Sequence, residues 1–498
     1  MSARLNSVKR GLFLDSVILM QISRTISKLE NVEDAAVMMG TPANQEILNN
    51  SNLLTDDGKI AKGGDLIIAV RASDEPSAHL ALNQATSLIE RPVILKEQSS
   101  DVLPATLRAA LDDNPNANLA LISVPGEFAA AEAWKALRAG LDVMIFSDNV
   151  SIEAEAQLKQ EARKSNRIVM GPDCGTAILA GVPLAFANEV PAGNIGIIGA
   201  SGTGIQEVVC LIARAGFGIS HAIGVGGRDL SDPVGGLSTL TAIELLDSDP
   251  ATEHIVLISK PPSERVVKVI TKAINRSRKF FTVCFLGSAD YVLPNNAVSV
   301  KTLKAAAVNV TKIQPDTSSA GDLVSTGRAG AKWIRGLYSG GSLSSEAQVI
   351  LISHGLKVAS NSPIVGADLY VEPSAGHVII DLGDDKYTVG RPHPMIEPAV
   401  RDQPLLDAFQ DPSVKVILLD LVLGYGSSLD PADHIASLLQ QNWNNDPTII
   451  ASVTGTEYDP QVFSRQVDIL HAAGVYVAPS NADAAEAAVK LLSMQYDS

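Results

Sequence analysis

A glycine-rich turn follows an apolar run and offers the clearest anion-binding chemistry in this sequence. The run Ile195–Ile198 leads into Gly199-Ala200-Ser201-Gly202-Thr203-Gly204, and a helix is expected next. Glycines permit positive φ angles, so that consecutive backbone N–H groups can converge on one point. The start of the helix adds partial positive charge, and the hydroxyls of Ser201 and Thr203 can donate hydrogen bonds or cap it. The predicted phosphate- or carboxylate-binding residues are Gly199, Ser201, Gly202, Thr203 and Gly204. The turn has neither the lysine of a P-loop nor the spacing of a dinucleotide fingerprint, so an ordinary packing turn is the alternative.

A second turn repeats the pattern later in the chain. Ile334–Glu346 (IRGLYSGGSLSSE) parallels Ile195–Glu207 (IGIIGASGTGIQE), which makes Gly340, Gly341 and Ser342 a second candidate anion site. Glu207 and Glu346 fall at equivalent places, about one turn into the following helix. Two carboxylates that face one anion site could orient a nucleophile or act as acid and base. The alternative is a pair of helix residues that merely complement the helix dipole.

Three further loops contain residues that could contact a ligand. Arg391 and His393 stand in the proline-braced segment 390–396, where Arg391 could hold a phosphate or carboxylate in a bidentate manner and His393 could move protons. Open α/β sheets bind ligands at the carboxyl ends of their strands, which is where four candidate pocket residues are expected. These are Cys174, Gly175, Tyr425 and Gly426. A structural turn is the alternative for each loop. The acidic segment 381–385 does not supply a convincing oxygen cluster, so no metal site is predicted.

Alternating strand-like and helix-like runs set the expected architecture. The predicted fold is α/β and has four parts. They are a small α+β sandwich domain at 1–112, a Rossmann-like domain at 113–190, and two flavodoxin-like domains at 191–318 and 319–498, the last beginning with a linker. The internal repeat supports the last two, because two further landmarks recur in the same order in both.

Composition limits the function classes. The chain has 498 residues, 46% of them hydrophobic and only 4% aromatic, which suits parallel α/β layers. Its 39 basic and 55 acidic residues give a net charge of −16, which argues against nucleic acid or an anionic membrane as a partner. The three cysteines form no CxxC pair, and no apolar stretch is long enough for a membrane span. A cytoplasmic location is expected.

Taken together, the motifs resemble one family. The turns GPDCGTA and GASGTG are similar to those of the succinyl-CoA synthetase α-subunit, and Glu207 falls where that subunit has a glutamate. The full set of motifs is most similar to the FdrA family and covers nearly the whole chain. The segments are GPDCGTA, GASGTG, GGRDLS, SKPP, GRPHPMI and VLGYGS. This resemblance implies that the 113–190 domain is of the CoA-binding type and that the domains at 191–318 and 319–498 are of the succinyl-CoA-ligase type.

Two departures separate the chain from succinyl-CoA synthetases. Those enzymes phosphorylate a histidine after the strand that corresponds to Phe281–Leu286, but here the following residues, 287–291, read GSADY. The glycine-rich loop that holds CoA in the relatives should precede Asn118, yet residues 96–117 contain no glycine. The resemblance therefore implies a subunit of a phosphate-dependent transferase similar to oxamate carbamoyltransferase, which converts oxalurate and phosphate to oxamate and carbamoyl phosphate in anaerobic allantoin and purine degradation.

Two other function classes stay open at this point. One is an ADP-forming acyl-CoA synthetase, and the other is a regulatory subunit that binds metabolites without turnover. Phosphate or carbamoyl phosphate is the expected substrate, with CoA or a nucleotide as a possible cofactor. The expected partners are other subunits of a hetero-oligomeric enzyme and further copies of this chain.

Overall fold

The computed structural model describes residues 3–12, 14, 16–90, 104–288, 291–316, 323, 330–372, 375–388, 393–444 and 446–493. The chain divides into two compact units. The first contains Met1–Ala117, and the second contains most of the chain from Asn118 onwards. None of the helices in these ranges is long and apolar enough to cross a membrane.

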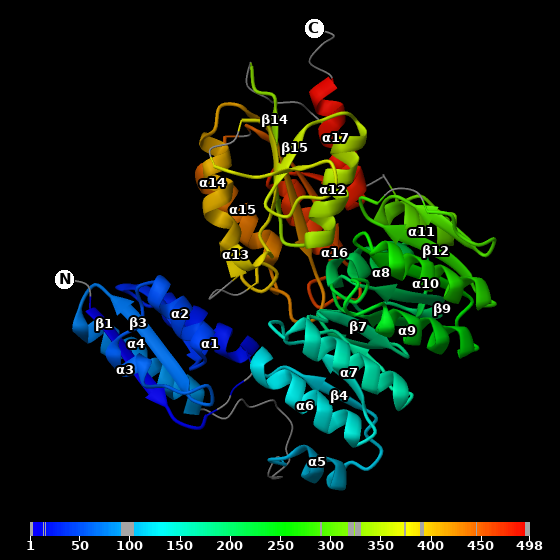
Figure 1. Ribbon diagram of the computed structural model, residues 1–498. Coiled ribbons are helices and arrows are strands. Elements are labelled where there is room, and N and C mark those ends of the chain that lie inside the picture. The colour runs from blue at the N-terminus through cyan, green and yellow to red at the C-terminus, as the bar shows by residue number, and fades with distance from the viewer. Residues whose placement is uncertain are drawn as a thin grey trace. The chain divides into compact units, whose positions relative to one another are not determined.

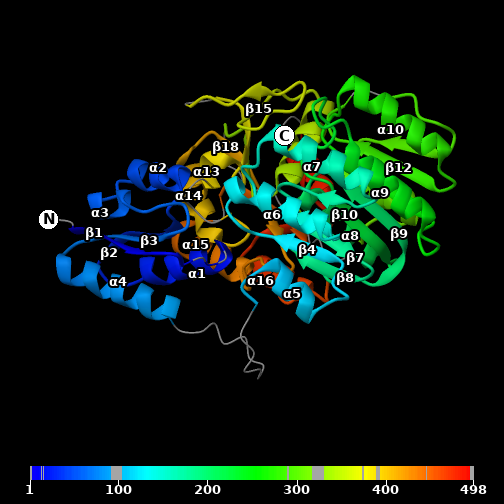
Figure 2. The ribbon, with the colours of Figure 1, turned by 60° about the horizontal axis from the view of Figure 1, so that its bottom comes forward.

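The first unit is built on a small antiparallel sheet. Its strands and helices are β1 (Ala3–Lys9), α1 (Ser16–Ser27), β2 (Val32–Met39), α2 (Pro42–Asn50), α3 (Asp56–Lys59), β3 (Leu66–Ala72), α4 (Glu75–Glu90) and α5 (Leu107–Asp113). The described strands pair in the order β1-β3-β2. Helices α1 and α4 lie on one side of the sheet and α2 and α3 on the other (Figure 2), which explains why the central strand β3 is almost completely buried. This is the small α+β domain that the sequence predicts.

The second unit begins with a short parallel sheet. Its elements are β4 (Leu119–Ile122), α6 (Gly126–Arg138), β5 (Asp142–Ile145), α7 (Ile152–Lys164) and β6 (Val169–Met170). The described strands pair in the order β4-β5-β6, as expected from the βαβ rhythm of the sequence.

The next sheet has the strand order of a flavodoxin-like domain. Its elements are β7 (Thr176–Leu179), β8 (Val182–Ala185), β9 (Ala192–Gly199), α8 (Gly202–Arg214), β10 (Ile219–Gly224), α9 (Leu237–Ser248), β11 (His254–Ser259), α10 (Glu264–Arg276), β12 (Phe280–Phe285), β13 (Ala297–Val300) and α11 (Leu303–Thr311). Within the described residues the order is β13-β12-β11-β9-β10-β7-β8, in which β10-β9-β11-β12-β13 are parallel and form the 2-1-3-4-5 pattern. The hairpin β7–β8 joins this sheet through β10, although its residues fall in the predicted 113–190 domain.

Among the described residues, the last sheet has seven parallel strands, two more than the parallel part of the preceding sheet. Its elements are β14 (Trp333–Tyr338), α12 (Gly341–Ser353), β15 (Val358–Ser360), β16 (Asp368–Leu369), β17 (His377–Asp381), α13 (Asp385–Thr388), the 3₁₀ helix η1 (Pro398–Arg401), α14 (Asp402–Gln410), β18 (Val414–Val422), α15 (Pro431–Asn442), β19 (Thr448–Thr454), α16 (Phe463–Ala472), β20 (Tyr476–Ala478) and α17 (Asn481–Ser493). In the part of the chain that is described, the parallel strands run β16-β15-β17-β14-β18-β19-β20. Helices α14 and α15 lie on one side of β14, and α12 and α17 on the other (Figure 1).

Four helices form the layer between the two large sheets. Helices α8 and α11 from the first sheet and α12 and α17 from the second share one continuous hydrophobic core. Helix α8 presents Ile205, Val208, Val209 and Ile212 to it, at the spacing expected of one helix face. This layer holds the start of α8 beside the start of α12.

A buried ion cluster fixes helix α7 to the loop after β10. The Lys159 ammonium lies 2.8 Å from a Glu155 carboxylate oxygen and 2.9 Å from an Asp229 oxygen. It also donates to the carbonyl of Val225 at 2.8 Å. All three charged side chains are buried, so their desolvation is offset only while the cluster is complete.

Removal of the lysine should therefore destabilise the second unit strongly. We expect Lys159→Ala to lower the free energy of unfolding by about 3–5 kcal/mol, because Asp229 loses its ammonium partner in the interior and Glu155 keeps only the ion pair with Arg228, 2.9 Å away. The exposed Lys164 on the same helix gives the matched control, and Lys164→Ala should change stability by less than about 0.5 kcal/mol. Denaturant unfolding of the full chain measures both, and equal effects would contradict the role of the cluster.

Candidate active site at two helix N-termini

The first turns of α8 and α12 face each other. The Ser342 hydroxyl donates a hydrogen bond to the Ser201 oxygen at 2.7 Å. A Cβ added to Gly340 would lie 3.0 Å from Thr203, and one added to Gly204 would lie 3.3 Å from Ser342. The structure thus brings together the two glycine-rich turns that the sequence predicts as anion sites.

Both helix starts present backbone donors. Ser201 is the N-cap of α8 and accepts from the Gly204 N–H, whereas Gly340 caps α12 without a side chain. No hydrogen bond joins the N–H groups of Gly202 or Gly341 to the described part of the chain. Unpaired N–H groups in the first turn of a helix favour an anion, and here two such turns converge.

A buried ion pair shapes the turn before α12. The N–H groups of Ser339 and Gly340 donate to the Asp420 carboxylate at 2.6 and 2.7 Å. Arg401 lies 2.6 Å from the same carboxylate, and both side chains are buried. Asp420 therefore fixes the entry of the chain into α12 and leaves the next N–H groups for a ligand.

Glu207 and Glu346 cap helices of the opposite domain. Glu207, from the first large domain, accepts from the Asn481 N–H at the start of α17 (3.1 Å) and from the Thr454 hydroxyl. Glu346, from the second, accepts from the Leu303 N–H at the start of α11 (2.6 Å). The Asn481 side chain also donates to Glu346 at 2.7 Å, so that this one residue bridges the two carboxylates.

Through these contacts the two glutamates stabilise the packing of the helices. Their residues are 1% and 0% exposed, and burial raises the pKa of both, that of Glu346 to about 7. Their assignment as acid and base at an anion site stays a prediction. Their oxygens are engaged by helix N-termini.

His393 lies beside the start of α12. A Cβ added to Gly383 would come within 2.7 Å of its Nε2 atom and within 2.8 Å of the Ser339 carbonyl oxygen. Burial lowers the pKa of His393 to about 4, so the ring is neutral at pH 7. Arg391, predicted with it, lies outside the described residues and stays a prediction.

The four predicted pocket residues lie in packed turns. Cys174 is buried against the carbonyls of Thr176 and Gly224, and burial raises the pKa of its thiol to about 12. Its neighbour Gly175 accepts from the N–H of Phe186, against whose ring Gly426 also packs. The Tyr425 hydroxyl donates to Glu189 at 2.6 Å. Cys174 is therefore packed, whereas Tyr425 is 40% exposed, and the assignment of the four residues to a ligand pocket stays a prediction.

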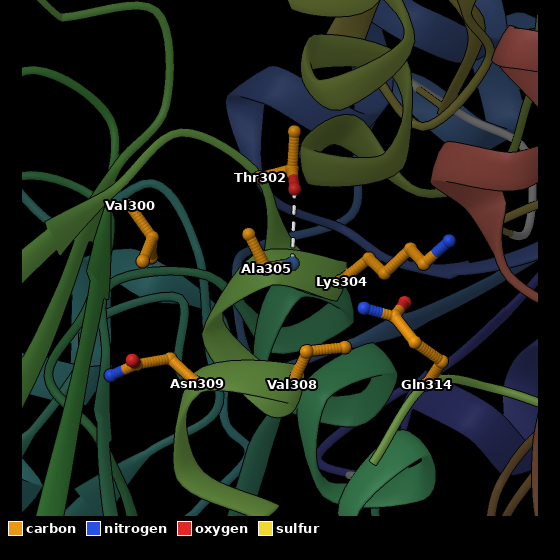
Figure 3. A pocket seen from close by; sticks show the side chains of 7 residues that line it. All are labelled: Val300, Thr302, Lys304, Ala305, Val308, Asn309 and Gln314. Carbon is orange, nitrogen blue, oxygen red and sulfur yellow. Dashed lines mark hydrogen bonds between the residues drawn. The ribbon is translucent and has the colours of Figure 1, made fainter. Parts of the chain in front are cut away.

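A surface pocket of about 360 Å³ lies elsewhere, along α11 (Figure 3). Its lining residues are Val300, Thr302, Lys304, Ala305, Val308, Asn309 and Gln314. Thr302 is committed to the N-cap of α11, and Lys304 lies 2.5 Å from Asp483. None of these residues belongs to the two predicted anion-binding turns.

Sequence reasoning missed the polar residues that support these turns. Asp381 ends β17 and could have been found by the rule that ligands meet at the carboxyl ends of strands. Asp420 interrupts an otherwise apolar strand, which was a second available signal. Nothing in the sequence indicates that Asn481 bridges Glu207 and Glu346.

Three family models match the chain. The AllF, heavy metal-associated domain matches residues 1–102, the CoA binding domain matches 191–287, and the CoA-ligase model matches 337–491. The CoA-binding match thus falls downstream of the 113–190 range to which the sequence analysis assigns that type of domain. The fold and these matches define a relative of the ADP-forming acyl-CoA ligases.

Individual relatives narrow this assignment. The chain is 38% identical over 495 residues to the uncharacterized protein YahF of Escherichia coli K12, covering 95% of this chain and 96% of YahF. The chain belongs to the YahF-like family, a relative of the FdrA proteins. It is also 31% identical over 180 residues to the α-subunit of Aquifex aeolicus succinate–CoA ligase, which covers 34% of this chain and 57% of that subunit. An acetyl-coenzyme A synthetase from Ca. Korarchaeum cryptofilum aligns over 76% of this chain and 85% of its own, with 15% identity and a TM-score of 0.30, which is too low to support any argument about function.

The CoA-binding match agrees with the turn before α8. That match covers the β9–α8 turn, whose unpaired N–H groups and Ser201 hydroxyl are suited to phosphate oxygens. Gly227 adds an open position, since a Cβ there would meet only the Ala200 carbonyl oxygen at 3.7 Å. Ser201, Gly202, Thr203 and Gly227 are thus the residues that would hold the phosphates of CoA, which would supply a thiol as acyl acceptor.

The residues of the N-terminal domain do not fit a heavy metal. Soft metals are held by cysteine thiolates, methionine thioethers and histidines, and Met38 and Met39 of this domain pack into its hydrophobic cores. Residues 1–102 contain no cysteine, and their single histidine, His79, is exposed and 3.8 Å from Glu75. The described residues contain no cluster of three potential ligands. This domain therefore shares the fold of its family without the chemistry of a metal carrier.

The cross-domain caps can be tested by stability. We expect Glu346→Ala to lower the free energy of unfolding by about 2–4 kcal/mol, because the N–H groups of Leu303 and Lys304 lose their acceptor. Glu264, exposed in the first turn of α10, is the matched control, and its alanine variant should lose less than about 1 kcal/mol. Equal losses in denaturant titrations would contradict the capping role.

The absence of a thiol site predicts the metal behaviour of the N-terminal domain. Titration of the full chain with Zn²⁺ or Cu⁺ should show only weak binding that a competing chelator removes, and His79→Ala should leave it unchanged. Stoichiometric binding that survives the chelator and disappears in His79→Ala would contradict this expectation.

Proposed function

We propose that this chain is a subunit of a phosphate-dependent carbamoyl- or acyl-transferring enzyme. The observation that carries the proposal is the meeting of two helix N-termini from two similar domains, joined by the hydrogen bond between Ser342 and Ser201. Backbone donors from both helices would hold phosphate and stabilise the oxyanion that develops on the substrate carbonyl. Local amides act within a few ångströms, so the net charge of −16 does not oppose this binding.

The proposed reaction is phosphorolysis of oxalurate to oxamate and carbamoyl phosphate. The AllF-type match at residues 1–102 supports a link to allantoin degradation. The segment that follows β12 contains no histidine between 287 and 291, which favours direct transfer to phosphate over a phosphohistidine route. Arg391 would hold the substrate carboxylate and His393 would contact the reacting groups. Other subunits of the enzyme, and further copies of this chain, are the proposed partners.

An ADP-forming acyl-CoA ligase is the second candidate. The CoA-binding match over residues 191–287 and the likeness to a succinate–CoA ligase α-subunit favour it. The two functions differ in what they require, because the transferase needs phosphate alone and the ligase needs CoA and a nucleotide. Carbamoyl phosphate formation and CoA-dependent nucleotide hydrolysis, measured with and without partner subunits, separate them. Metabolite binding without either activity would indicate a regulatory subunit.

Ser201 provides the sharpest variant for this proposal. Its oxygen accepts from Ser342 and Gly204, so its own hydrogen is available to a phosphate oxygen. We expect Ser201→Ala to raise the KM for phosphate about tenfold, the cost of one hydrogen bond to a charged group. The measurement is the initial rate of carbamoyl phosphate formation by the assembled enzyme.

Ser263 supplies the matched control, because it caps α10 in the same domain and its hydroxyl donates to Asp232. Ser263→Ala should lower the melting temperature as much as Ser201→Ala does, because each variant loses a helix cap. Its KM for phosphate should stay unchanged. An unchanged KM for phosphate in Ser201→Ala would show that phosphate does not bind at this turn.

A further inference from the structure

The buried carboxyl group of Asp381 places one of its two oxygens, Oδ2, at the start of α12. Asp381 ends β17 and is 7% exposed. Its Oδ1 atom accepts from the Gly383 N–H at 3.0 Å, whereas no hydrogen bond joins Oδ2 to the residues that the structure describes. A Cβ added to Gly341 would lie 2.7 Å from Oδ2, so this oxygen sits directly on the first residue of the helix.

The surroundings of Asp381 favour its protonated form. Burial raises the pKa of this carboxyl from 3.8 to about 7. The carboxylates of Asp384 and Asp420 act in the same direction, while the Lys260 ammonium and the Gly383 N–H oppose them. At neutral pH, Asp381 can therefore both donate and accept a proton, as an acid–base residue must.

His393 completes a set of hydrogen-bond donors around this point. Its Nδ1 atom accepts from the Met395 N–H at 3.2 Å, so the neutral ring has its hydrogen on Nε2. A Cβ added to Gly383 would lie 2.7 Å from that Nε2 and 3.2 Å from the Asp381 Oδ1. Only glycine leaves space between the two side chains, and no described residue accepts the Nε2 hydrogen.

We propose that Asp381 is the proton-transferring residue of this site and that it binds, in its protonated form, an oxyanion seated on the start of α12. The oxyanion is a phosphate or carboxylate group, which would accept from the Asp381 hydroxyl, the His393 Nε2–H and the Gly341 N–H. This inference rests on the proposed function only for the reaction step that follows.

In that step Asp381 relays one proton. A phosphate oxygen forms a bond to the substrate carbonyl carbon, and the carbon–nitrogen bond breaks with its electron pair on the leaving nitrogen. Asp381 gives its proton to that nitrogen and then receives the proton of the attacking hydrogen phosphate. The carboxyl returns to its starting state, and no further reactant is needed.

Sulfate binding tests the protonated donor, because sulfate has the shape of phosphate but does not titrate near neutral pH. Calorimetry on the full chain should show that affinity falls about tenfold or more from about pH 6 to about pH 8.5. Titrations near pH 7.5 in two buffers of different ionisation enthalpy should show uptake of a proton by the wild-type chain. Binding without proton uptake, or no sulfate binding at either pH, would overturn the proposal.

Asp381→Asn replaces the titrating hydroxyl by an amide that always donates. We expect this variant to bind sulfate equally at both pH values, with an affinity close to that of the wild-type chain at low pH. Asp384→Asn is the matched control and should keep the pH dependence. Retention of the full pH dependence in Asp381→Asn would assign it to another group and overturn the proposal.

Turnover measurements distinguish a failure of this inference from a failure of the proposed function. In the assembled enzyme, Asp381→Asn should abolish carbamoyl phosphate formation while sulfate binding persists. Undiminished turnover in this variant would overturn the proton relay. If the wild-type enzyme showed no phosphorolysis, the proposed function would be wrong. The sulfate titrations would still test whether Asp381 binds an oxyanion in its protonated form.

Discussion

The reciprocal capping of α17 by Glu207 and of α11 by Glu346 is the constraint on which the candidate site depends. Each glutamate stands at the sixth residue of a 13-residue helix, and each closes the N-terminus of a helix from the other domain. Asn481 forms hydrogen bonds with both carboxylates, and these bonds fix the position of α8 along α12. The meeting of Ser201 and Ser342, one turn earlier, follows from that register.

This arrangement also explains why two carboxylates can be buried side by side. A helix N-terminus supplies unpaired N–H groups and partial positive charge, which replace the water that each glutamate loses. Burial raises the pKa of Glu346 to about 7, and the nearby Glu207 carboxylate adds to this effect.

Local patterns in the sequence predict the helices and strands well, but not the contacts between domains. The apolar run Ile195–Ile198 lies within β9, and the helix expected after the glycine-rich turn begins at Gly202, because apolar runs and turn residues are local signals. The repeat of the two glycine-rich turns predicts that two equivalent sites exist, and the structure brings them together. The capping contacts of Glu207 and Glu346 could not be predicted, since equivalent positions on two helices do not reveal what each helix packs against. Likewise the hairpin β7–β8 could not be assigned to its sheet, because pairing with β10 is a long-range property.

The repeated scaffold supports an asymmetric site. At α8 the capping residue is Ser201, and no carboxylate contacts the turn in the described residues, so this helix start is suited to the more highly charged anion. At α12 the cap is Gly340, Asp420 takes the preceding N–H groups, and Asp381 covers the first residue. Negative charge is thus already present at the second helix start, and only a proton on Asp381 makes it a donor. The group that gains or loses a proton during the reaction would therefore lie at α12. Two copies of one fold provide the two different environments that a transfer reaction requires.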